Sequence, residues 1–359
     1  MGDSSIEWTD KTWNPTRGCR RISPGCERCY AETMAARFCG AGQPFDGLLQ
    51  LGKQGPRWNG EGRFVPDKLD EPLHWRKPAR VFVNSMSDLF FEEFSDEQIA
   101  SVFGVMAACP HHTFQVLTKR PERVVRWFEW VERQAREVNA GRGMSTSAFC
   151  LAHSQRGAAD PRLTQNLDYI FARPWPLPNV WIGVSVEDQR RADERLPLLL
   201  RIPAAVRFVS YEPALGPVDF KSWLRKPWRC DGCGVPAGGL PPRKCAYCGL
   251  VEAVEHAPPE PGIDWLIVGG ESGPGARPFE LAWARSVVKQ CKAAGVPVFV
   301  KQLGACASDP VNGIAGAALR VPDDAKGLIS LRLKDRKGGD ISEFPEDLRV
   351  REFPEVRPC

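Results

Sequence analysis

Apolar and polar positions are arranged along this chain in blocks rather than residue by residue. Apolar runs closed by polar residues recur at 80–88, 113–120, 179–187, 206–213, 263–272 and 297–302. Near-continuous apolar runs of this kind are typical of parallel strands that are buried on both faces. Helical periodicity fills several of the intervals, at 96–108, 122–138, 189–200 and 283–294. This β-α alternation predicts an α/β fold, either a (β/α) barrel or a doubly wound sheet.

The polar residues that close the runs fall at or just after the carboxyl ends of the predicted strands. They are Ser85, Asp88, Thr118, Lys119, Ser185, Glu187, Ser210, Glu212, Glu271 and Lys301. In a (β/α) barrel these ends converge on one mouth, which forms the active site. Each residue taken alone is better explained as a solvated loop residue or a helix cap. Six strands that repeat the pattern favour a shared site.

Two stretches interrupt the alternation. Residues 139–176 are rich in Gly, Ser, Arg and Pro and indicate an insertion, and residues 218–262 indicate a second insertion. The segment 305–359 has weak periodicity and is interpreted as a C-terminal extension. We therefore expect residues 1–217 and 263–304 to form the α/β body. The glycine-rich segment 269–275 lacks the P-loop lysine and the G-x-G-x-x-G spacing, so it supports nucleotide binding only weakly.

Composition and charge exclude several classes of protein. The 359 residues are 43% hydrophobic and 26% charged, as in soluble globular proteins. No apolar stretch is long enough to cross a membrane, and the start lacks the features of a secretory signal. The net charge of +4 is small for a protein coated by a polyanion but compatible with a local basic groove. We expect a cytoplasmic protein.

Thirteen cysteines are the unusual feature of the composition. The number is odd, so a complete set of intramolecular disulfides is impossible, and a reducing compartment is expected. Seven of them fall into two clusters. One cluster consists of two Cys-x-x-Cys hooks, formed by Cys230, Cys233, Cys245 and Cys248. Four thiolates at this spacing predict a closed, structural zinc site, with an iron–sulfur cluster as the alternative.

The other cluster contains only three cysteines, Cys19, Cys26 and Cys29. Three thiolates on a four-iron cluster leave one iron open to an exogenous ligand, which suits chemistry rather than electron transfer. Pro24 and Gly25 predict a turn before Cys26, and residues 30–37 favour a helix. The helix dipole would stabilise thiolate and cluster charge. The alternative is a zinc site completed by Cys39 or by a histidine.

Tryptophans near the start of the chain are interleaved with basic residues. Trp8, Trp13, Trp58 and Trp75 lie among many arginines between residues 17 and 80. Such interleaving suits stacking on bases and contact with phosphates, and ordinary aromatic packing is the alternative.

The cysteine motif carries a resemblance to a known family. Residues 6–19 read IEWTDKTWNPTRGC and residues 23–31 read SPGCERCYA. Further motifs are NSMSDLF at 84–90, LTKRP at 117–121, GVSVE at 183–187, SYEP at 210–213 and GGES at 269–272. Together they resemble an uncharacterised, phage-associated family of radical S-adenosylmethionine (SAM) type, distantly similar to spore photoproduct lyase. The resemblance covers most of residues 6–304.

The resemblance implies a partial (β/α) barrel with a [4Fe–4S] cluster on Cys19, Cys26 and Cys29, whose open iron binds SAM. Two departures stand out. The cysteine spacing is longer than the usual Cys-x3-Cys-x2-Cys, and residues 84–88 occupy the place where a Gly-Gly-Glu motif usually contacts the SAM amine. Ser85 and Asp88 are therefore candidates for the amine side and Tyr30 for adenine packing. Ser185, Glu187 and Glu271 are candidates for binding cofactor or substrate.

These observations predict a radical SAM enzyme acting on a nucleic-acid base or nucleotide, in phage DNA hypermodification such as rearrangement of a modified pyrimidine. The resemblance implies DNA or a nucleotide as substrate, an electron donor such as flavodoxin or ferredoxin, and the host cytoplasm if the protein is phage-encoded. A radical repair lyase for damaged pyrimidines is one alternative. Another is a non-catalytic, metal-stabilised nucleic-acid-binding protein, with zinc at both cysteine clusters.

Overall fold

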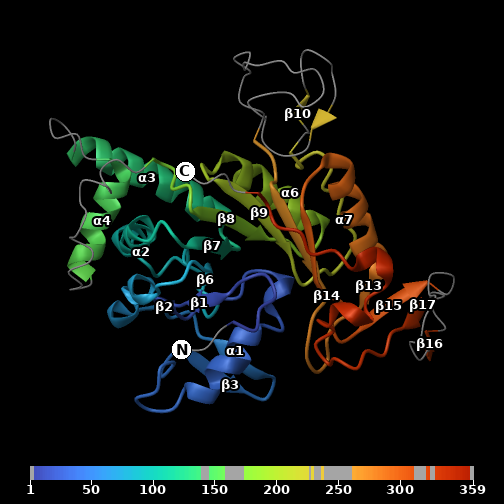
Figure 1. Ribbon diagram of the computed structural model, residues 1–359. Coiled ribbons are helices and arrows are strands. Elements are labelled where there is room, and N and C mark those ends of the chain that lie inside the picture. The colour runs from blue at the N-terminus through green and yellow to red at the C-terminus, as the bar shows by residue number, and fades with distance from the viewer. Residues whose placement is uncertain are drawn as a thin grey trace. The chain divides into compact units, whose positions relative to one another are not determined.

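The computed structural model describes most of the chain. The described residues are 4–138, 145–157, 174–225, 228–229, 236–237, 261–310, 321–323 and 328–355. Two compact units are present (Figure 1). The first comprises Met1–Ser185 and Arg201–Ala205, and the second comprises Val186–Leu200 and Val206–Cys359.

Parallel strands form the main sheet, as the apolar runs predict. In the first unit these are, in sheet order, β1 (Lys11–Trp13), β6 (Arg80–Val83), β7 (Thr113–Thr118) and β8 (Val180–Ser185). In the second unit they are β9 (Val206–Tyr211), β12 (Trp265–Gly269) and β14 (Val298–Gln302). Every residue of β8 and β12 is buried, which explains their unbroken apolar runs. The prediction of an α/β fold with a parallel sheet is confirmed.

Three helices complete the larger part of the first unit: α2 (Asp96–Ala108), α3 (Pro121–Val138) and α4 (Thr146–Gly157). Ser95 and Gln98 form a capping box at the start of α2. Helix α4 lies within the expected insertion 139–176 and packs closely on α2. The two helices approach so closely that a Cβ at Gly104 would collide with Cys150. Part of the segment interpreted as an insertion therefore belongs to the core of the first unit.

A small N-terminal layer carries the three grouped cysteines. Its elements are β2 (Thr16–Arg17) paired with β5 (Arg63–Phe64), the hairpin of β3 (Leu49–Gly52) and β4 (Gly55–Trp58), helix α1 (Tyr30–Ala35), and the 3-10 turns η1 (Pro24–Cys26), η2 (Ala36–Phe38), η3 (Pro66–Lys68) and η4 (Glu71–His74). Its core consists of Ala31, Ala35, Phe45, Leu48 and Trp58. We call this cluster the α1 core.

The second unit adds α6 (Gln189–Arg201), α7 (Leu281–Ala294) and a small sheet. The sheet order is β13 (Phe279–Glu280), β15 (Ala307–Pro310), β17 (Leu328–Ser330) and β16 (Val321–Asp323). The short strands β10 (Trp228–Arg229) and β11 (Pro236–Ala237) pair with each other, and η6 (Ile341–Glu343) and η7 (Glu346–Leu348) lie near the C-terminus. The end of the chain packs on the main sheet, because Trp265 donates to the carbonyl of Glu352 at 2.8 Å.

No helix in the described ranges is both long and apolar enough to cross a membrane.

Candidate functional site

The three grouped cysteines lie on a loop that follows β2 and runs into α1. The loop begins at Gly18, whose φ of 87° favours glycine, and a Cβ there would collide with the carbonyl of Glu61. Cys26 closes the turn η1 after Pro24, and Cys29 is the N-cap residue of α1. The predicted turn and the predicted helix start are both present. We call residues 18–29 the cysteine loop.

Burial shapes the chemistry of these thiols. Cys19 and Cys29 both pack against the α1 core. Desolvation raises the pKa of Cys19 to about 12, although the nearby Arg120 guanidinium opposes the rise and the Cys29 thiol adds to it. Burial also raises the pKa of Cys29. The charges of Cys26 and Cys29 both act on Arg21. The Cys19 and Cys29 thiols therefore interact electrostatically with each other, and the Cys26 and Cys29 thiols both interact with Arg21.

Some of the predicted metal ligands lie in the described residues and others do not. Cys39 packs against the α1 core, and its thiol lies 3.2 Å from the carbonyl oxygen of Ala36. In the described ranges, no group of three His, Cys, Asp or Glu side chains is arranged to hold a metal ion. The predicted zinc ligands Cys230, Cys233, Cys245 and Cys248 lie outside the described residues.

A buried carboxylate on α1 holds the cysteine loop in place. Glu32 is 1% exposed and accepts hydrogen bonds from Nε of Arg21 at 2.9 and 3.1 Å. It also accepts the backbone N–H of Trp58 at 2.9 Å. The hydrogen bond to Glu32 raises the pKa of Arg21. The Glu32 side chain thus connects the cysteine loop, α1 and β4. A sequence segment that favours a helix does not indicate these contacts.

A second buried carboxylate organises the ends of β6 and β7. Asp88 accepts four hydrogen bonds: from the backbone N–H groups of Phe90 and Lys119 at 3.0 Å each, from the Thr118 hydroxyl at 2.7 Å and from Arg120 Nη1 at 3.0 Å. The side chains of Asp88 and Arg120 are only 9% and 5% exposed. The structure brings Asp88 and Thr118 together, as their positions at neighbouring strand ends predict. Asp88 therefore fixes both Arg120 and the turn after β7.

Arg120 in turn connects this turn to the cysteine loop. Its Nη1 lies 3.8 Å from Sγ of Cys19, and its Nη2 donates to the carbonyl of Arg20 at 3.1 Å. Its Nε donates to both carboxylate oxygens of Glu92 at 3.1 Å. Desolvation lowers the pKa of Arg120, but the surrounding negative groups outweigh it and raise the pKa overall. A fixed positive charge therefore stands beside Cys19. In the sequence this arginine is part of the LTKRP motif, but nothing there indicates that it contacts the cysteine loop.

Tyr30 and Ser85, two predicted cofactor residues, are in contact. The Tyr30 hydroxyl donates to the carbonyl of Ser85 at 2.6 Å. The Ser85 hydroxyl donates to Oδ1 of Asn14 at 3.2 Å, and the N–H of Met86 donates to the same oxygen at 3.0 Å. The segment that follows β6 is therefore bonded both to the start of α1 and to the chain after β1.

Asn84 is a candidate that the sequence analysis missed. It follows β6 directly, is 2% exposed and has a φ of 63°. Within the described part of the chain, neither Nδ2 nor Oδ1 of this buried amide has a hydrogen-bond partner. A buried polar group without a partner costs about 1–3 kcal/mol, and strained backbone clusters at functional sites. Asn84 thus offers a donor and an acceptor to a ligand. The sequence signals for it are its place at the start of the NSMSDLF motif and its residue type, because an asparagine after an apolar run tolerates positive φ.

The remaining predicted cofactor residues are buried or form ion pairs within the protein. Ser185, at the end of β8, is 3% exposed. In the second unit, fully buried Glu187 forms an ion pair with Arg195 at 3.0 Å. Glu271 forms an ion pair with Arg277 at 2.7 Å.

A further ion pair in the second unit explains part of the glycine-rich segment. Lys301 Nζ lies 3.0 and 3.2 Å from the carboxylate oxygens of Glu212, and the Ser210 hydroxyl lies 3.4 Å from one of them. A Cβ at Gly269 would come within 2.7 Å of Glu212 Oε1, and one at Gly270 would collide with a neighbouring carbonyl. Close backbone packing therefore requires Gly270, and a side chain at Gly269 would displace the Glu212 carboxylate, independently of any nucleotide.

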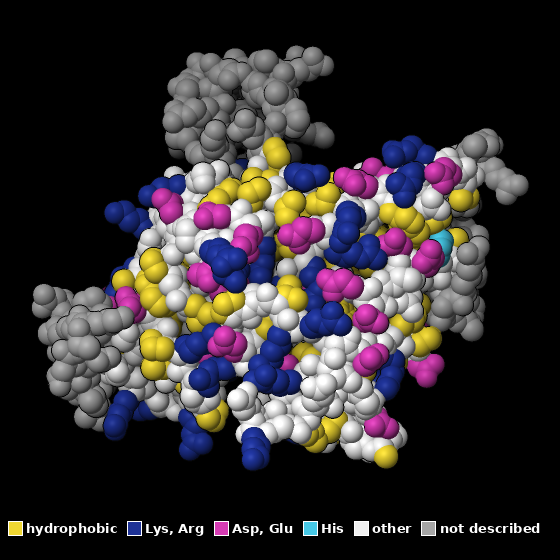
Figure 2. Space-filling view, turned by 180° about the vertical axis from the view of Figure 1, so that it is seen from behind, with side chains coloured by type: hydrophobic (Ala, Val, Ile, Leu, Met, Phe, Trp, Pro, Cys, Tyr) yellow, Lys and Arg dark blue, Asp and Glu magenta, His cyan; other side chains and the backbone are white. Residues whose placement is uncertain are grey.

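The tryptophans near the start of the chain are largely core residues. Trp8, Trp13 and Trp58 are buried, so the packing interpretation is correct for these three. Trp75 has Lys11 Nζ 5.5 Å from its ring centroid. On the face shown in Figure 2, basic and acidic side chains are interspersed and do not separate by sign.

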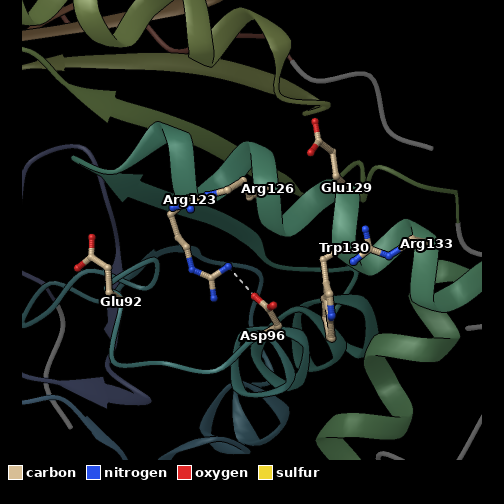
Figure 3. A pocket seen from close by; sticks show the side chains of 7 residues that line it. All are labelled: Glu92, Asp96, Arg123, Arg126, Glu129, Trp130 and Arg133. Carbon is tan, nitrogen blue, oxygen red and sulfur yellow. Dashed lines mark ion pairs between the residues drawn. The ribbon is translucent and has the colours of Figure 1, made fainter.

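A pocket of about 510 Å³ lies along α3 (Figure 3). Its lining residues are Glu92, Asp96, Arg123, Arg126, Glu129, Trp130 and Arg133. Arg123 points to Asp96 and pairs with it at 2.5 Å. Three arginines and three acidic residues balance one another, so the pocket has no net preference for an anion.

Comparisons with known proteins place the chain in a family. Neither the curated proteins nor the solved structures gave a match. A family model matches residues 3–339 and therefore nearly the whole chain. The protein belongs to the family described as "Protein of unknown function (DUF5131)".

Proposed function

We propose that this protein is a radical SAM enzyme that acts on a nucleic-acid base or nucleotide. In this proposal Cys19, Cys26 and Cys29 hold a [4Fe–4S] cluster, and SAM binds beside it at the ends of β6 and β7. The observation that carries the proposal is the cysteine loop itself, where the Cys19 thiol lies 3.8 Å from Nη1 of the fixed Arg120 and the charges of Cys26 and Cys29 both act on Arg21. The parallel strands are compatible with a partial barrel of radical SAM type.

The chemistry of the loop fits an iron–sulfur cluster. Cys19 and Cys29 line an apolar cluster, and ligation by iron would relieve the cost of ionising buried thiols. Arg120 Nη1, 3.8 Å from Cys19 Sγ, can donate to a ligating sulfur. Glu32 holds Arg21 of the loop, and Asp88 holds Arg120, which donates to the loop carbonyl of Arg20, so these contacts fix the position of the loop.

The end of β6 fits the methionine end of SAM. Asn84 presents a buried donor and a buried acceptor that have no partner among the described residues, which suits a ligand that carries both an amine and a carboxylate. Ser85 lies next to it, and Tyr30 is half exposed at the start of α1. In the proposal Asn84 and Ser85 orient the amino-acid part of SAM, and Tyr30 lies against the adenine.

When bound, the cluster and SAM would supply a 5′-deoxyadenosyl radical for hydrogen abstraction from substrate. The chain's contribution is to position SAM and exclude competing reactions. Asp88 keeps Arg120 in place, and Arg120 holds the cysteine loop against the end of β7. Ser185, Glu187 and Glu271 remain candidates for contact with cofactor or substrate.

The nature of the substrate is the less supported part of the proposal. The resemblance to a phage-associated family supports DNA hypermodification. Zinc at Cys230, Cys233, Cys245 and Cys248 is a further element of the proposal, and a zinc knuckle could also contact nucleic acid.

Anaerobic reconstitution with iron, sulfide, SAM and dithionite tests the core of the proposal. We expect a brown protein that releases 5′-deoxyadenosine, detected by mass spectrometry. The variant Cys26→Ser should lose both properties. Cys39→Ser is the matched control, because Cys39 packs against the same α1 core but is outside the proposed ligand set.

Three outcomes separate the hypotheses. An intact cluster without release of 5′-deoxyadenosine would overturn the assignment to SAM chemistry. Zinc in place of iron at the cysteine loop would favour the non-catalytic nucleic-acid-binding protein. Equal loss of iron in Cys26→Ser and Cys39→Ser would overturn the proposed ligand set.

A further inference from the structure

The exposed hydrophobic side chains of this protein are concentrated around the cysteine loop. Of the large hydrophobic residues that are exposed in the described ranges, all but Val138 fall between residues 22 and 51. They are Ile22 (43% exposed), Tyr30 (52%), Met34 (40%), Phe38 (48%) and Leu51 (69%). Single exposed apolar residues need no explanation, but a concentration of them marks an interaction surface.

Three of these side chains follow one another along α1 and the turn that continues it. Tyr30 and Met34 are four residues apart on α1 and therefore share a helical face, and Phe38 ends the 3-10 turn η2 that follows α1 directly. The opposite face of α1 is buried through Ala31 and Ala35 in the α1 core. The helix is thus apolar on its exposed side as well as on its buried side, which an isolated solvent-facing helix does not need. We call this set the α1 stripe.

The segment that carries the stripe has an excess of positive charge. Residues 17–63 contain eight Lys and Arg against four Asp and Glu, a surplus equal to the net charge of +4 of the whole chain. Arg20, Arg28, Arg37, Arg57 and Arg63 are all exposed within this segment. The rest of the chain is therefore neutral on balance, and two of the exposed arginines adjoin the stripe directly, Arg37 on η2 and Arg28 just before the N-cap of α1.

This combination fits an acidic protein rather than DNA. Tyr, Phe, Met and Arg are enriched in the centres of protein–protein interfaces. Aliphatic and thioether side chains such as Ile22, Met34 and Leu51 neither stack on bases nor bind phosphate, and protein–DNA interfaces are more polar. A basic rim steers an acidic partner and speeds its association.

We propose that the α1 stripe and its arginines are the docking surface for an acidic one-electron carrier protein. This inference rests on the proposed function, in which an external one-electron reductant must first reduce the cluster before SAM can be cleaved. Cys29 is the N-cap of α1 and Tyr30 is its first residue, so a carrier seated on the stripe would lie against the loop that holds the cluster. The carrier is oxidised by one electron and the cluster is reduced by one.

The test compares two reductants on the reconstituted protein, photoreduced flavodoxin and dithionite, by stopped-flow absorbance of the cluster. For Met34→Glu and Phe38→Glu we expect reduction by flavodoxin to slow about tenfold, as when an interface anchor is lost. Reduction by the small dithionite ion should be unchanged. Val138→Glu is the matched control, because Val138 on α3 is as exposed as Phe38, 48% in each case.

Charge is tested separately with Arg37→Glu, for which we expect slower reduction by flavodoxin and a weaker dependence on salt. Arg126→Glu, at an exposed position on α3, is its control. Circular dichroism checks that each variant is folded.

The outcomes distinguish this inference from the function on which it rests. If no cluster forms, or dithionite supports no release of 5′-deoxyadenosine, the proposed function fails. If the cluster forms and flavodoxin reduces the stripe variants as fast as Val138→Glu, the docking surface is overturned. Loss of duplex-DNA binding or of a dimer in the stripe variants, with flavodoxin reduction unchanged, would instead identify a nucleic-acid interface or a self-interface.

Discussion

The Asp88–Arg120 ion pair should be one of the most sensitive points of the first unit. In Asp88→Asn the shape is kept, but the side chain loses its charge. One of its two oxygens becomes an amide nitrogen that must face donors, either Arg120 and the N–H of Lys119, or the N–H of Phe90 and the Thr118 hydroxyl. Both members of the pair are more than nine-tenths buried, so water cannot replace the lost interaction.

Removing one partner of a buried ion pair costs about 3–5 kcal/mol. Glu92 still accepts from Arg120 in the variant, so we expect a loss near the lower limit, about 3 kcal/mol. For a unit of this size that corresponds to a fall of about 6–12 °C in Tm.

Urea unfolding of the unloaded protein, followed by tryptophan fluorescence, measures this loss directly. Glu92→Gln is the control: the Glu92 side chain is 55% exposed, so its pairing with Arg120 should contribute less than about 1 kcal/mol. The double variant Asp88→Asn/Arg120→Met should be less destabilised than the sum of the single variants, because it leaves no uncompensated charge. A loss below about 1 kcal/mol in Asp88→Asn would refute the assignment of Asp88 as the anchor of this region.

Three further predictions concern other sites. Gly270→Ala should destabilise the protein by about 1–3 kcal/mol in urea, because its Cβ would collide with the backbone carbonyl oxygen of Leu303, whereas Gly216→Ala, with open space around it, should be neutral. Burial lowers the pKa of His112 from 6.5 to about 4, so the neutral imidazole contributes stability above pH 6.5 that is lost as the pH falls toward 4. In His112→Gln the urea midpoint should therefore depend less on pH over this range, and an unchanged pH profile would contradict the prediction. Asn84→Gly should raise the free energy of unfolding by about 1 kcal/mol, because it removes backbone strain and a buried side-chain amide that has no partner among the described residues. The same variant should bind SAM more weakly in equilibrium dialysis, and unaltered binding would argue against a ligand at Asn84.

Regular elements were predictable where local signals and burial agree. Helix α2 spans the predicted 96–108 because Ser95 and Gln98 cap its start and apolar residues continue along its length. The short strand β1 was missed, since three residues carry no period and its place is set by pairing with β6. Helix α4 was missed because its polar neighbours in the sequence conceal a helix that packs closely on α2.

Prediction of the candidate site had the same limit. Asp88 could be selected because it follows an apolar run, and the cysteines because of their grouping. Arg120 lies 32 residues after Asp88, and only the parallel pairing of β6 with β7 brings the two together. Glu32 belongs to a segment for which the sequence predicts only a helix. It is buried because the cysteine loop and β4 both pack against α1 at this position. Long-range contacts of this kind leave no spacing in a single sequence.

Hydrogen bonding separates supporting residues from candidates for ligand contact at the ends of β6 and β7. Asp88 accepts four hydrogen bonds and Glu32 accepts bonds from two segments, so neither has capacity left for a ligand without giving up a structural partner. Asn84 differs from both, since its side-chain amide is equally buried but has no hydrogen-bond partner among the described residues. A fold retains an unpaired, strained residue only where the surrounding structure holds it and something is gained by it. For the SAM site of the proposed function we therefore propose Asn84 rather than Asp88 as the amine-side contact, with Asp88 acting through Arg120 on the cysteine loop.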